Sequence, residues 1–292
     1  MDAINPQGVL ALEAGLPFEV RRIGKIMSAP LIFASPHSGR VYPTQMMSAS
    51  NLDGGQIRCS EDAHVDGLIE GGLEHGATLL INRFARAYVD VNREPYELDQ
   101  AMFEDELPAF ARGRSARVAA GLGAIARIVA DGQEIYNRKL TFAEARGRIE
   151  QVHEPYHDAL QALIIEAMDR FGRALVIDWH SMPSAAARTG QGTACDFVLG
   201  DRYGRACSRQ VIEAAERTLS GLGYQVARNN PYAGGYTTEH YGRPQSGVHA
   251  LQIEINRALY LDEARVCASP AFAGVKADLE WLFASLAALP LA

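Results

Sequence analysis

The sequence lacks the features that would place the protein in a membrane or outside the cell. No apolar run approaches the roughly 20 residues that a membrane-spanning helix needs. The first 15 residues carry acidic side chains and no basic segment before a long apolar core, which argues against a signal peptide. The four cysteines, Cys59, Cys195, Cys207 and Cys267, include no CxxC pair, so we expect reduced thiols. These absences predict a cytoplasmic protein with no membrane partner.

Positive charge is scarce as well. The chain has 28 Lys and Arg residues against 35 Asp and Glu residues, a net charge of −7 at pH 7. Proteins that bind a nucleic-acid backbone usually cluster Lys and Arg, so we expect no nucleic-acid partner. A local basic pocket for a small anionic molecule stays compatible with this balance. The oligomeric state does not follow from these features.

Apolar runs alternate with helical patterns along the chain. The strand-like runs lie at 31–35, 77–81, 87–91, 174–178, 196–199 and 250–255. This order favours an α/β fold, a three-layer αβα sandwich with a mixed sheet, in which the short spacing from Leu79 to Val91 predicts one antiparallel pair. No repeat or linker divides the chain, so we predict a single domain over residues 1–292. Residues 94–140 are the least regular part and are expected to form an excursion that covers the site.

Two histidines follow apolar runs, His37 in LIFASPHSG and His180 in ALVIDWHSM. Open α/β sheets place their chemistry at the carboxyl ends of strands, where both imidazoles would emerge. A single histidine near a strand end is usually structural. Two of them, each followed by serine and with acidic residues nearby, predict a metal site instead.

A third ligand is needed, because catalytic zinc usually takes three protein ligands and one water. Neither histidine is followed by an acidic residue at the i+3 position, and SEDAHVD at 60–66 is the densest alternative source. We expect Asp62 to be the ligand, with Glu61 and His64 as alternatives. Both acids could instead complement a helix dipole at an N-terminus, so spacing alone leaves the two roles open.

The segment NRFARAYVDVNREP, residues 82–95, concentrates polar groups on a strand-like frame. In a strand, one face would carry Arg86, Tyr88, Asp90 and Asn92. A guanidinium matches a carboxylate with two hydrogen bonds, and a neighbouring amide adds another donor. The pair Asn92 and Arg93 therefore predicts binding of a substrate carboxylate, with a surface ion-pair ladder as the structural alternative.

Near the C-terminal end, GVHALQIEINRALY places Glu254 in an apolar, strand-like stretch. A buried acid is costly unless it is paired or functional, and desolvation raises its pKa toward the range of a general base. Arg257 could instead neutralise it from the following turn. His249 precedes the strand, and we expect it to contact the substrate near Glu254. For His64 and His240 a substrate contact, a partner of a metal ligand and a structural role all stay open.

Together, these segments resemble the N-formylglutamate amidohydrolase family. SPHSGRVYP, the Asp62 region, RAYVDVNREP, DWHSMPS, DFVLGDR and GGYTTEHYGRPQSGVHALQIEIN stand in the family's order and span most of the chain. The family is similar to the zinc carboxypeptidases and aspartoacylase, which implies a phosphorylase/hydrolase-like αβα fold with one zinc ion per chain. The usual His-x-x-Glu ligand pair of that wider group is absent, because Arg40 occupies the acidic position.

The resemblance also implies roles for the candidate residues. His37, Asp62 and His180 would hold the metal, and Glu254 would be the general base and then the general acid. Arg86 would polarise the scissile carbonyl, while Asn92 and Arg93 would bind the substrate carboxylate. The implied reaction is hydrolysis of N-formyl-L-glutamate to formate and L-glutamate, in histidine degradation.

Two other functions stay open. A metal and a base do not specify the acyl group or the side chain, so the substrate could be another N-acyl amino acid or a peptide-like amide. A non-catalytic protein that binds a carboxylate metabolite is the second alternative. The combination of His37, His180 and Glu254 argues against a purely binding role.

Overall fold

The computed structural model describes residues 15–290 except 112, 114, 130–131 and 188–193. These residues form two compact units, each described here by itself. The smaller unit holds the described residues up to Glu19, then Pro36–Glu61 and Asn82–Asp158, and the larger unit holds Val20–Ser35, Asp62–Ile81 and the chain from Ala159 on. No helix among the described residues is long and apolar enough to cross a membrane. The predicted absence of a signal peptide concerns a segment that lies almost wholly outside them.

Seven strands in the described part of the chain form one mixed sheet in the order β1-β3-β2-β4-β7-β5-β6. They are β1 (Phe18–Arg21), β2 (Leu31–Ser35), β3 (Thr78–Asn82), β4 (Ala174–Met182), β5 (Phe197–Gly200), β6 (Val226–Arg228) and β7 (Val248–Asn256). The central strands β3, β2, β4 and β7 run parallel, whereas β5 pairs antiparallel with β7. A separate antiparallel pair joins β8 (Leu261–Asp262) to β9 (Cys267–Ala268).

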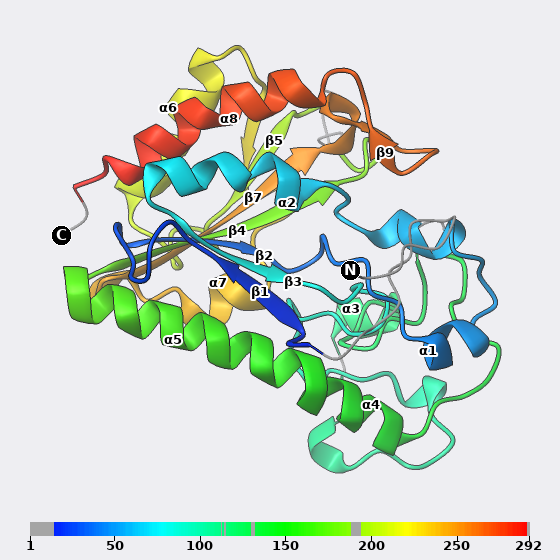
Figure 1. The fold of residues 1–292 in the computed structure, drawn as a ribbon. Coiled ribbons are helices and arrows are strands. Elements are labelled where there is room, and N and C mark those ends of the chain that lie inside the picture. Colours follow the sequence, from blue (N-terminus) through cyan, green and yellow to red (C-terminus); the bar gives the residue numbers. More distant parts are fainter. Residues whose placement is uncertain (1–14, 112, 114, 130–131, 188–193, 291–292) are drawn as a thin grey trace. The chain divides into compact units, whose positions relative to one another are not determined.

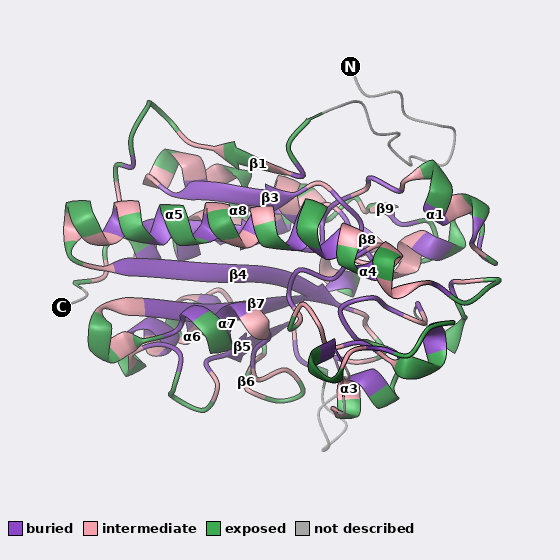
Figure 2. Cartoon of the chain, turned by 90° about the horizontal axis from the view of Figure 1, so that it is seen from below, coloured by how far each residue is buried: buried purple, intermediate pink, exposed green. Residues whose placement is uncertain are grey.

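Helices of the larger unit cover both faces of the sheet (Figure 1). One face carries α2 (Val65–Leu68), the 3-10 helix Glu70–His75, α6 (Arg209–Gly221) and α8 (Phe272–Ala287). Its apolar core includes Trp179 of β4 and Phe283 of α8, whose rings meet edge to face with centroids 5.7 Å apart. The other face is covered by α5 (Glu154–Phe171), which exposes one side and buries the other (Figure 2). The predicted αβα fold with a mixed sheet is confirmed.

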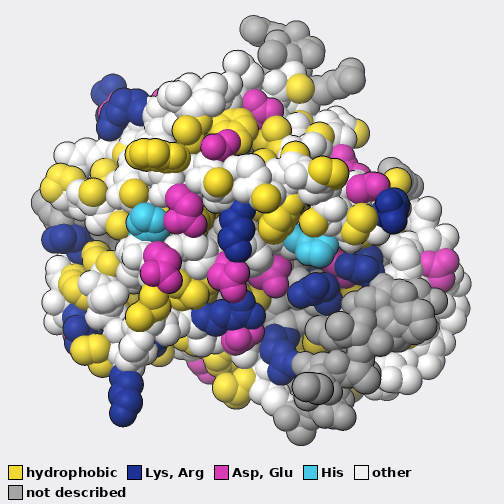
Figure 3. All heavy atoms as spheres, turned by 45° about the horizontal axis from the view of Figure 1, so that its top comes forward, with side chains coloured by type: hydrophobic (Ala, Val, Ile, Leu, Met, Phe, Trp, Pro, Cys, Tyr) yellow, Lys and Arg dark blue, Asp and Glu magenta, His cyan; other side chains and the backbone are white. Residues whose placement is uncertain are grey.

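The helical face of the larger unit carries ion pairs at its surface. Lys276 bonds Glu70 at 2.9 Å, and His75 bonds Glu280 at 2.9 Å. On the face drawn in Figure 3, acidic and basic side chains are interspersed with apolar ones. Exposed pairs of this kind contribute roughly 0–1 kcal/mol each to stability. On the face drawn, this mixture makes no large patch of one sign.

The smaller unit relies on short elements and local hydrogen bonds. It contains α1 (Thr44–Ser48), α3 (Ala116–Ala119), α4 (Phe142–Arg148), the π-helical turn Ile149–His153 and, in its irregular part, the 3-10 turns Gln56–Ser60, Gln100–Met102 and Ala109–Ala111. Residues 94–140 are irregular as expected, although positions 112, 114 and 130–131 lie outside the described residues. Whether this segment covers a site, and whether residues 1–292 act as one domain, stay predictions.

The predicted strand at 87–91 is wrong. The chain leaves β3 at Asn82 and turns, with the Tyr88 amide donating to the Ala85 carbonyl at 2.9 Å. The apolar side chains Ala85 and Ala87 fill a small cluster with Tyr42 rather than one face of a sheet. The antiparallel pair of the sheet is β5 and β7 instead. Alternating apolar residues here reflect packing of a buried loop.

Candidate metal centre and active site

Four polar side chains stand together near the carboxyl ends of β4 and β7. Asp178 lies opposite Gln252, and His180 lies opposite Glu254. Because alternate residues of a strand share one face, these four side chains occupy the same face of the sheet. All of them are buried. Polar groups of this density on a buried sheet face are costly unless they bond to one another or to a ligand.

His180 lies between two carboxylates. Its Nδ1 is 3.0 Å from Asp62 Oδ2, and its Nε2 is 3.0 Å from Asp178 Oδ2. Burial by itself would lower the pKa of His180, but the Asp178 and Asp62 carboxylates together raise it well above its usual value. Asp178 precedes His180 by two residues on the same strand face, so the strand itself fixes this pair.

Asp62 is held on both of its oxygens. Oδ2 faces His180, while Oδ1 accepts a hydrogen bond from Arg257 Nη2 at 3.1 Å. The neighbouring acid is engaged elsewhere, because Glu61 Oε1 accepts from the Tyr42 hydroxyl at 2.8 Å. Burial raises the pKa of Glu61 despite its hydrogen bonds from Arg58 and Tyr42. The geometry therefore favours Asp62 over Glu61 as a ligand.

His37 follows the last residue of β2 by two positions. Its Nε2 is 2.7 Å from Asp90 Oδ1, and Asp90 Oδ2 accepts from Arg86 Nη2 at 2.8 Å. The backbone amide of Asn92 also donates to Asp90 Oδ1 at 2.9 Å. Burial alone would raise the pKa of Asp90, but the charges of His37 and Arg86 hold it well below its usual value. An ionised Asp90 thus orients the His37 ring.

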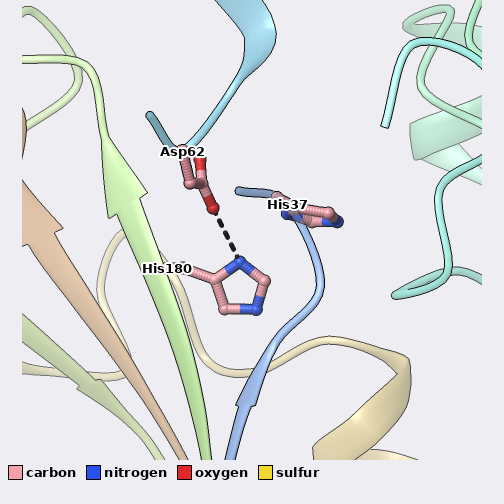
Figure 4. A group of neighbouring side chains, drawn as sticks. All are labelled: His37, Asp62 and His180. Carbon is pink, nitrogen blue, oxygen red and sulfur yellow. Dashed lines mark hydrogen bonds and ion pairs between the residues drawn. The ribbon is translucent and has the colours of Figure 1, made fainter. Parts of the chain in front are cut away.

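His37, Asp62 and His180 form a group that could bind a metal ion. Each offers one ligand atom, these atoms lie within 4.8 Å of one another, and all three residues are buried (Figure 4). Two imidazoles and a carboxylate are a common donor set for catalytic zinc. Each imidazole also contacts a further carboxylate, Asp90 or Asp178, as metal-binding histidines usually do.

Glu254 is fixed by its strand neighbour. Gln252 Nε2 donates to Glu254 Oε1 at 2.8 Å, and Gln252 Oε1 accepts from the Gly235 amide at 2.7 Å. The backbone at Gly234 has φ 125°, a region that glycine adopts readily. The glycine pair therefore anchors its loop to the side chain that orients Glu254.

Arg86, Asn92 and Arg93 belong to a loop and not to a strand. Arg93 donates from Nε to the Leu122 carbonyl at 3.1 Å and from Nη1 to the Asn92 carbonyl at 2.9 Å. Burial lowers the pKa of Arg93, with the Asp90 carboxylate opposing this effect. The loop is thus held by its own side chains, with Arg86 bonded to Asp90.

Two histidines that the sequence left unassigned secure the same loop. His153 Nε2 lies 2.9 Å from the Arg93 carbonyl, and His157 Nε2 lies 2.7 Å from the Val91 carbonyl. Their i,i+4 spacing, which places both on one helix face, was a signal for a shared role. Asp178 was likewise detectable from its position two residues before His180, and Gln252 from its position two residues before Glu254.

His249 lies away from the candidate site. It pairs with Leu175 and precedes Glu254 by five residues, which corresponds to about 16 Å along a strand. Its Nδ1 accepts from the Ser208 amide at 3.1 Å, and burial lowers its pKa. This placement argues against the substrate contact that the sequence predicted. His64 precedes α2 in a left-handed conformation, and His240 stacks on Tyr236 of α7 (Tyr236–Tyr241).

Comparisons with known proteins show the family of the chain. The sequence profile of the N-formylglutamate amidohydrolase family matches residues 29–261. The chain belongs to this family. An N-formylglutamate deformylase from Pseudomonas aeruginosa is 29% identical over 238 residues, which cover 80% of this chain and 83% of the relative. Another from Pseudomonas putida is 26% identical over 237 residues, covering 80% and 82%.

Solved structures of similar proteins share the fold. The N-formylglutamate amidohydrolase from Ralstonia eutropha has a TM-score of 0.87 and 36% identity, covering 93% of this chain and 97% of that one. A protein from Agrobacterium tumefaciens has a TM-score of 0.66 at 18% identity, covering 93% and 95%. The second likeness shows the fold alone.

Proposed function

We propose that the protein is a zinc-dependent amidohydrolase that cleaves N-formyl-L-glutamate to formate and L-glutamate. The observation that carries this proposal is the buried group His37, Asp62 and His180, with Glu254 paired beside His180 in the sheet. Membership of the family and the deformylase names of the Pseudomonas relatives support the substrate. The resemblance places the reaction in histidine degradation, and the four free cysteines favour the cytoplasm.

The metal ligands would be the two imidazoles and one oxygen of Asp62. When bound, zinc would supply Lewis-acid polarisation of the formyl carbonyl and would lower the pKa of a water molecule. Asp90 and Asp178 would keep the imidazoles in the orientation that binding requires, because each contacts a nitrogen of its histidine.

Glu254 would move the proton in both halves of the reaction. As general base it would accept a proton from the attacking water, and it would then deliver that proton to the leaving amine of glutamate. Gln252 holds Oε1 of Glu254 by a hydrogen bond of 2.8 Å, which restricts the rotation of the carboxylate. Formate and L-glutamate then leave, so that atoms and charge balance with one water consumed.

Arginine and asparagine side chains of the loop at 86–93 would bind the substrate. Arg86 donates to Asp90 Oδ2 at 2.8 Å, and its guanidinium, which has five N–H donors, would also donate to the formyl oxygen. A positive charge placed at a developing oxyanion typically lowers the activation barrier by about 3 kcal/mol. Asn92 and Arg93 would bind a carboxylate of the substrate.

Formate release from a panel of substrates tests this function. Zinc-loaded protein is assayed with N-formyl-L-glutamate, N-formyl-L-aspartate, N-formyl-L-leucine and, by release of acetate, N-acetyl-L-glutamate. We expect the highest kcat/KM for N-formyl-L-glutamate. A higher value for another amide would keep the hydrolase chemistry and replace the substrate, whereas binding without turnover of any of them would favour the carboxylate-binding alternative.

A further inference from the structure

The buried guanidinium of Arg257 contacts Asp62, one of the three candidate metal ligands. Arg257 is only 6% exposed, and its Nη2 donates to Asp62 Oδ1 at 3.1 Å. Its Nε donates to Ser181 Oγ at 3.1 Å, which fixes the plane of the fork. Asp62 therefore has one oxygen on Arg257 and the other, Oδ2, 3.0 Å from His180 Nδ1.

The chain sets this position by the way β7 ends. Asn256, the last residue of β7, accepts a hydrogen bond from the Ala258 amide at 3.0 Å and donates to the Cys195 carbonyl at 3.1 Å. These bonds begin the 3-10 turn Arg257–Leu259 directly at the strand end. Arg257 thus follows Glu254 by three residues and has its buried guanidinium beside β4, where Ser181 neighbours His180.

We propose that Arg257 is a positioning residue that presents a single oxygen of Asp62 to the metal ion. The inference rests on the proposed function, because it needs a metal at His37, Asp62 and His180. A carboxylate can bind a metal through one oxygen or both, and a free carboxylate can rotate between these modes. The guanidinium on Oδ1 restricts this rotation and keeps Oδ2, the oxygen beside His180 Nδ1, as the one that would bind the metal.

Two roles of Arg257 predict opposite effects on metal affinity. A positive charge close to a divalent cation repels it, so a purely electrostatic role predicts tighter zinc binding when Arg257 is neutralised. A positioning role predicts weaker binding, because the carboxylate must then be ordered when the metal binds. Loss of a side chain that orients a metal ligand typically costs roughly 10- to 100-fold in affinity.

Zinc affinity, measured by competition with a chromophoric chelator, separates these roles. We expect Arg257→Met to weaken zinc binding at least tenfold relative to the unmodified protein, and Arg257→Lys, which keeps the charge but not the fork, to lie between them. Arg22→Met is the matched control, because Arg22 also pairs with a carboxylate, Glu166 at 2.8 Å, but away from this centre. Its zinc affinity should be unchanged.

The absorption spectrum of the cobalt-substituted protein gives a second measure. If Arg257 restricts Asp62 to one oxygen, Arg257→Met should change the intensity of the cobalt bands, which report the number of ligands. An unchanged spectrum together with unchanged or tighter zinc binding would overturn the inference and leave the proposed function intact. If the unmodified protein binds no zinc, the proposed function itself fails. Should Arg257→Met not fold by circular dichroism, the affinity and spectrum of Arg257→Lys decide the question.

Discussion

The larger unit places its candidate functional side chains on neighbouring strands, whereas the candidate side chains of the smaller unit lie in loops that are tied by side-chain hydrogen bonds. In the larger unit, the β4 and β7 register alone brings His180 beside Glu254. In the smaller unit, no strand pairing among the described residues aligns His37 and Arg86. Hydrogen bonds from both side chains to Asp90 hold them instead. We infer that a change at Glu254 affects proton transfer, whereas changes in the loop affect how His37, Arg86 and the substrate are oriented.

The largest expected effect follows the loss of Glu254, the proposed base on β7. Glu254→Gln keeps the shape of the side chain and its neighbour Gln252, but removes the carboxylate that we propose as the proton acceptor. We expect the protein to retain zinc while kcat falls by roughly 100- to 10,000-fold. Formate release and zinc content measure this, with Glu70→Gln on the helical surface as the control. A near-normal kcat would remove Glu254 from its assigned role.

The two carboxylates that orient the histidines allow the units to be compared directly. Asp178→Asn in the larger unit and Asp90→Asn in the smaller unit should each weaken zinc binding by roughly 10- to 100-fold. Only Asp90→Asn should also lower kcat in zinc-saturated protein, because Arg86 loses its ionic partner there. Zinc competition and saturated kinetics test both statements. Equal kcat in the two variants at saturating zinc would contradict the link between Asp90 and Arg86.

A smaller and more selective effect is expected at Arg93. Arg93→Ala removes the proposed charged contact to the substrate carboxylate. A contact of this kind contributes about 1.5–3 kcal/mol, so KM should rise by roughly 10- to 100-fold with little change in kcat. Arg209→Ala is the control, since Arg209 bonds Glu213 on the exposed surface of α6. Steady-state kinetics with N-formyl-L-glutamate provide the measurement. An unchanged KM would show that Arg93 only supports its loop.

The smallest effect concerns the start of α4 and should leave catalysis unchanged. Thr141 and Glu144 form a capping box, and the hydrogen bonds of Arg138 lower the pKa of Glu144 to about 2. A carboxyl group whose pKa is lowered by folding stabilises the fold at pH values above its ordinary pKa of 4.5. This stabilisation is lost as the pH falls toward 2. Glu144→Gln should therefore cost about 1 kcal/mol at pH 7 and progressively less below pH 4.5.

Urea unfolding of both proteins between pH 7 and pH 3 checks this prediction. The difference in unfolding free energy between the unmodified protein and Glu144→Gln should shrink as the pH is lowered. A difference that stays constant over this range would mean that the charge of Glu144 does not contribute.

The sequence predicted the candidate site residues best where they lie on strands or directly after them. Apolar runs located β2, β4 and β7, and the polar residues that interrupt or follow them, His37, His180 and Glu254, were identified for that reason. It misled at His249, which is close to Glu254 in sequence but stands at the other end of an extended strand. A strand separates residues by about 3.3 Å each, so proximity in sequence is not proximity in space.

The loop groups were harder to predict because they depend on pairings between distant segments. The partners of Arg257, His153 and His157 lie far from them in sequence, and no local period reports such contacts. The alternation at 87–91 even predicted a strand where the chain turns. The residue types at 86–93 were recognised as functional candidates, but the hydrogen bonds that hold them required the structure.

Zinc titration of metal-stripped protein, followed by formate release from N-formyl-L-glutamate, tests the central claim most directly. We predict no activity without metal, a linear rise with added zinc, and saturation at one equivalent per chain. The variant His180→Ala, which removes one ligand, should not reach this activity at the same zinc concentration. Full activity of the metal-free protein would contradict a metal centre at His37, Asp62 and His180.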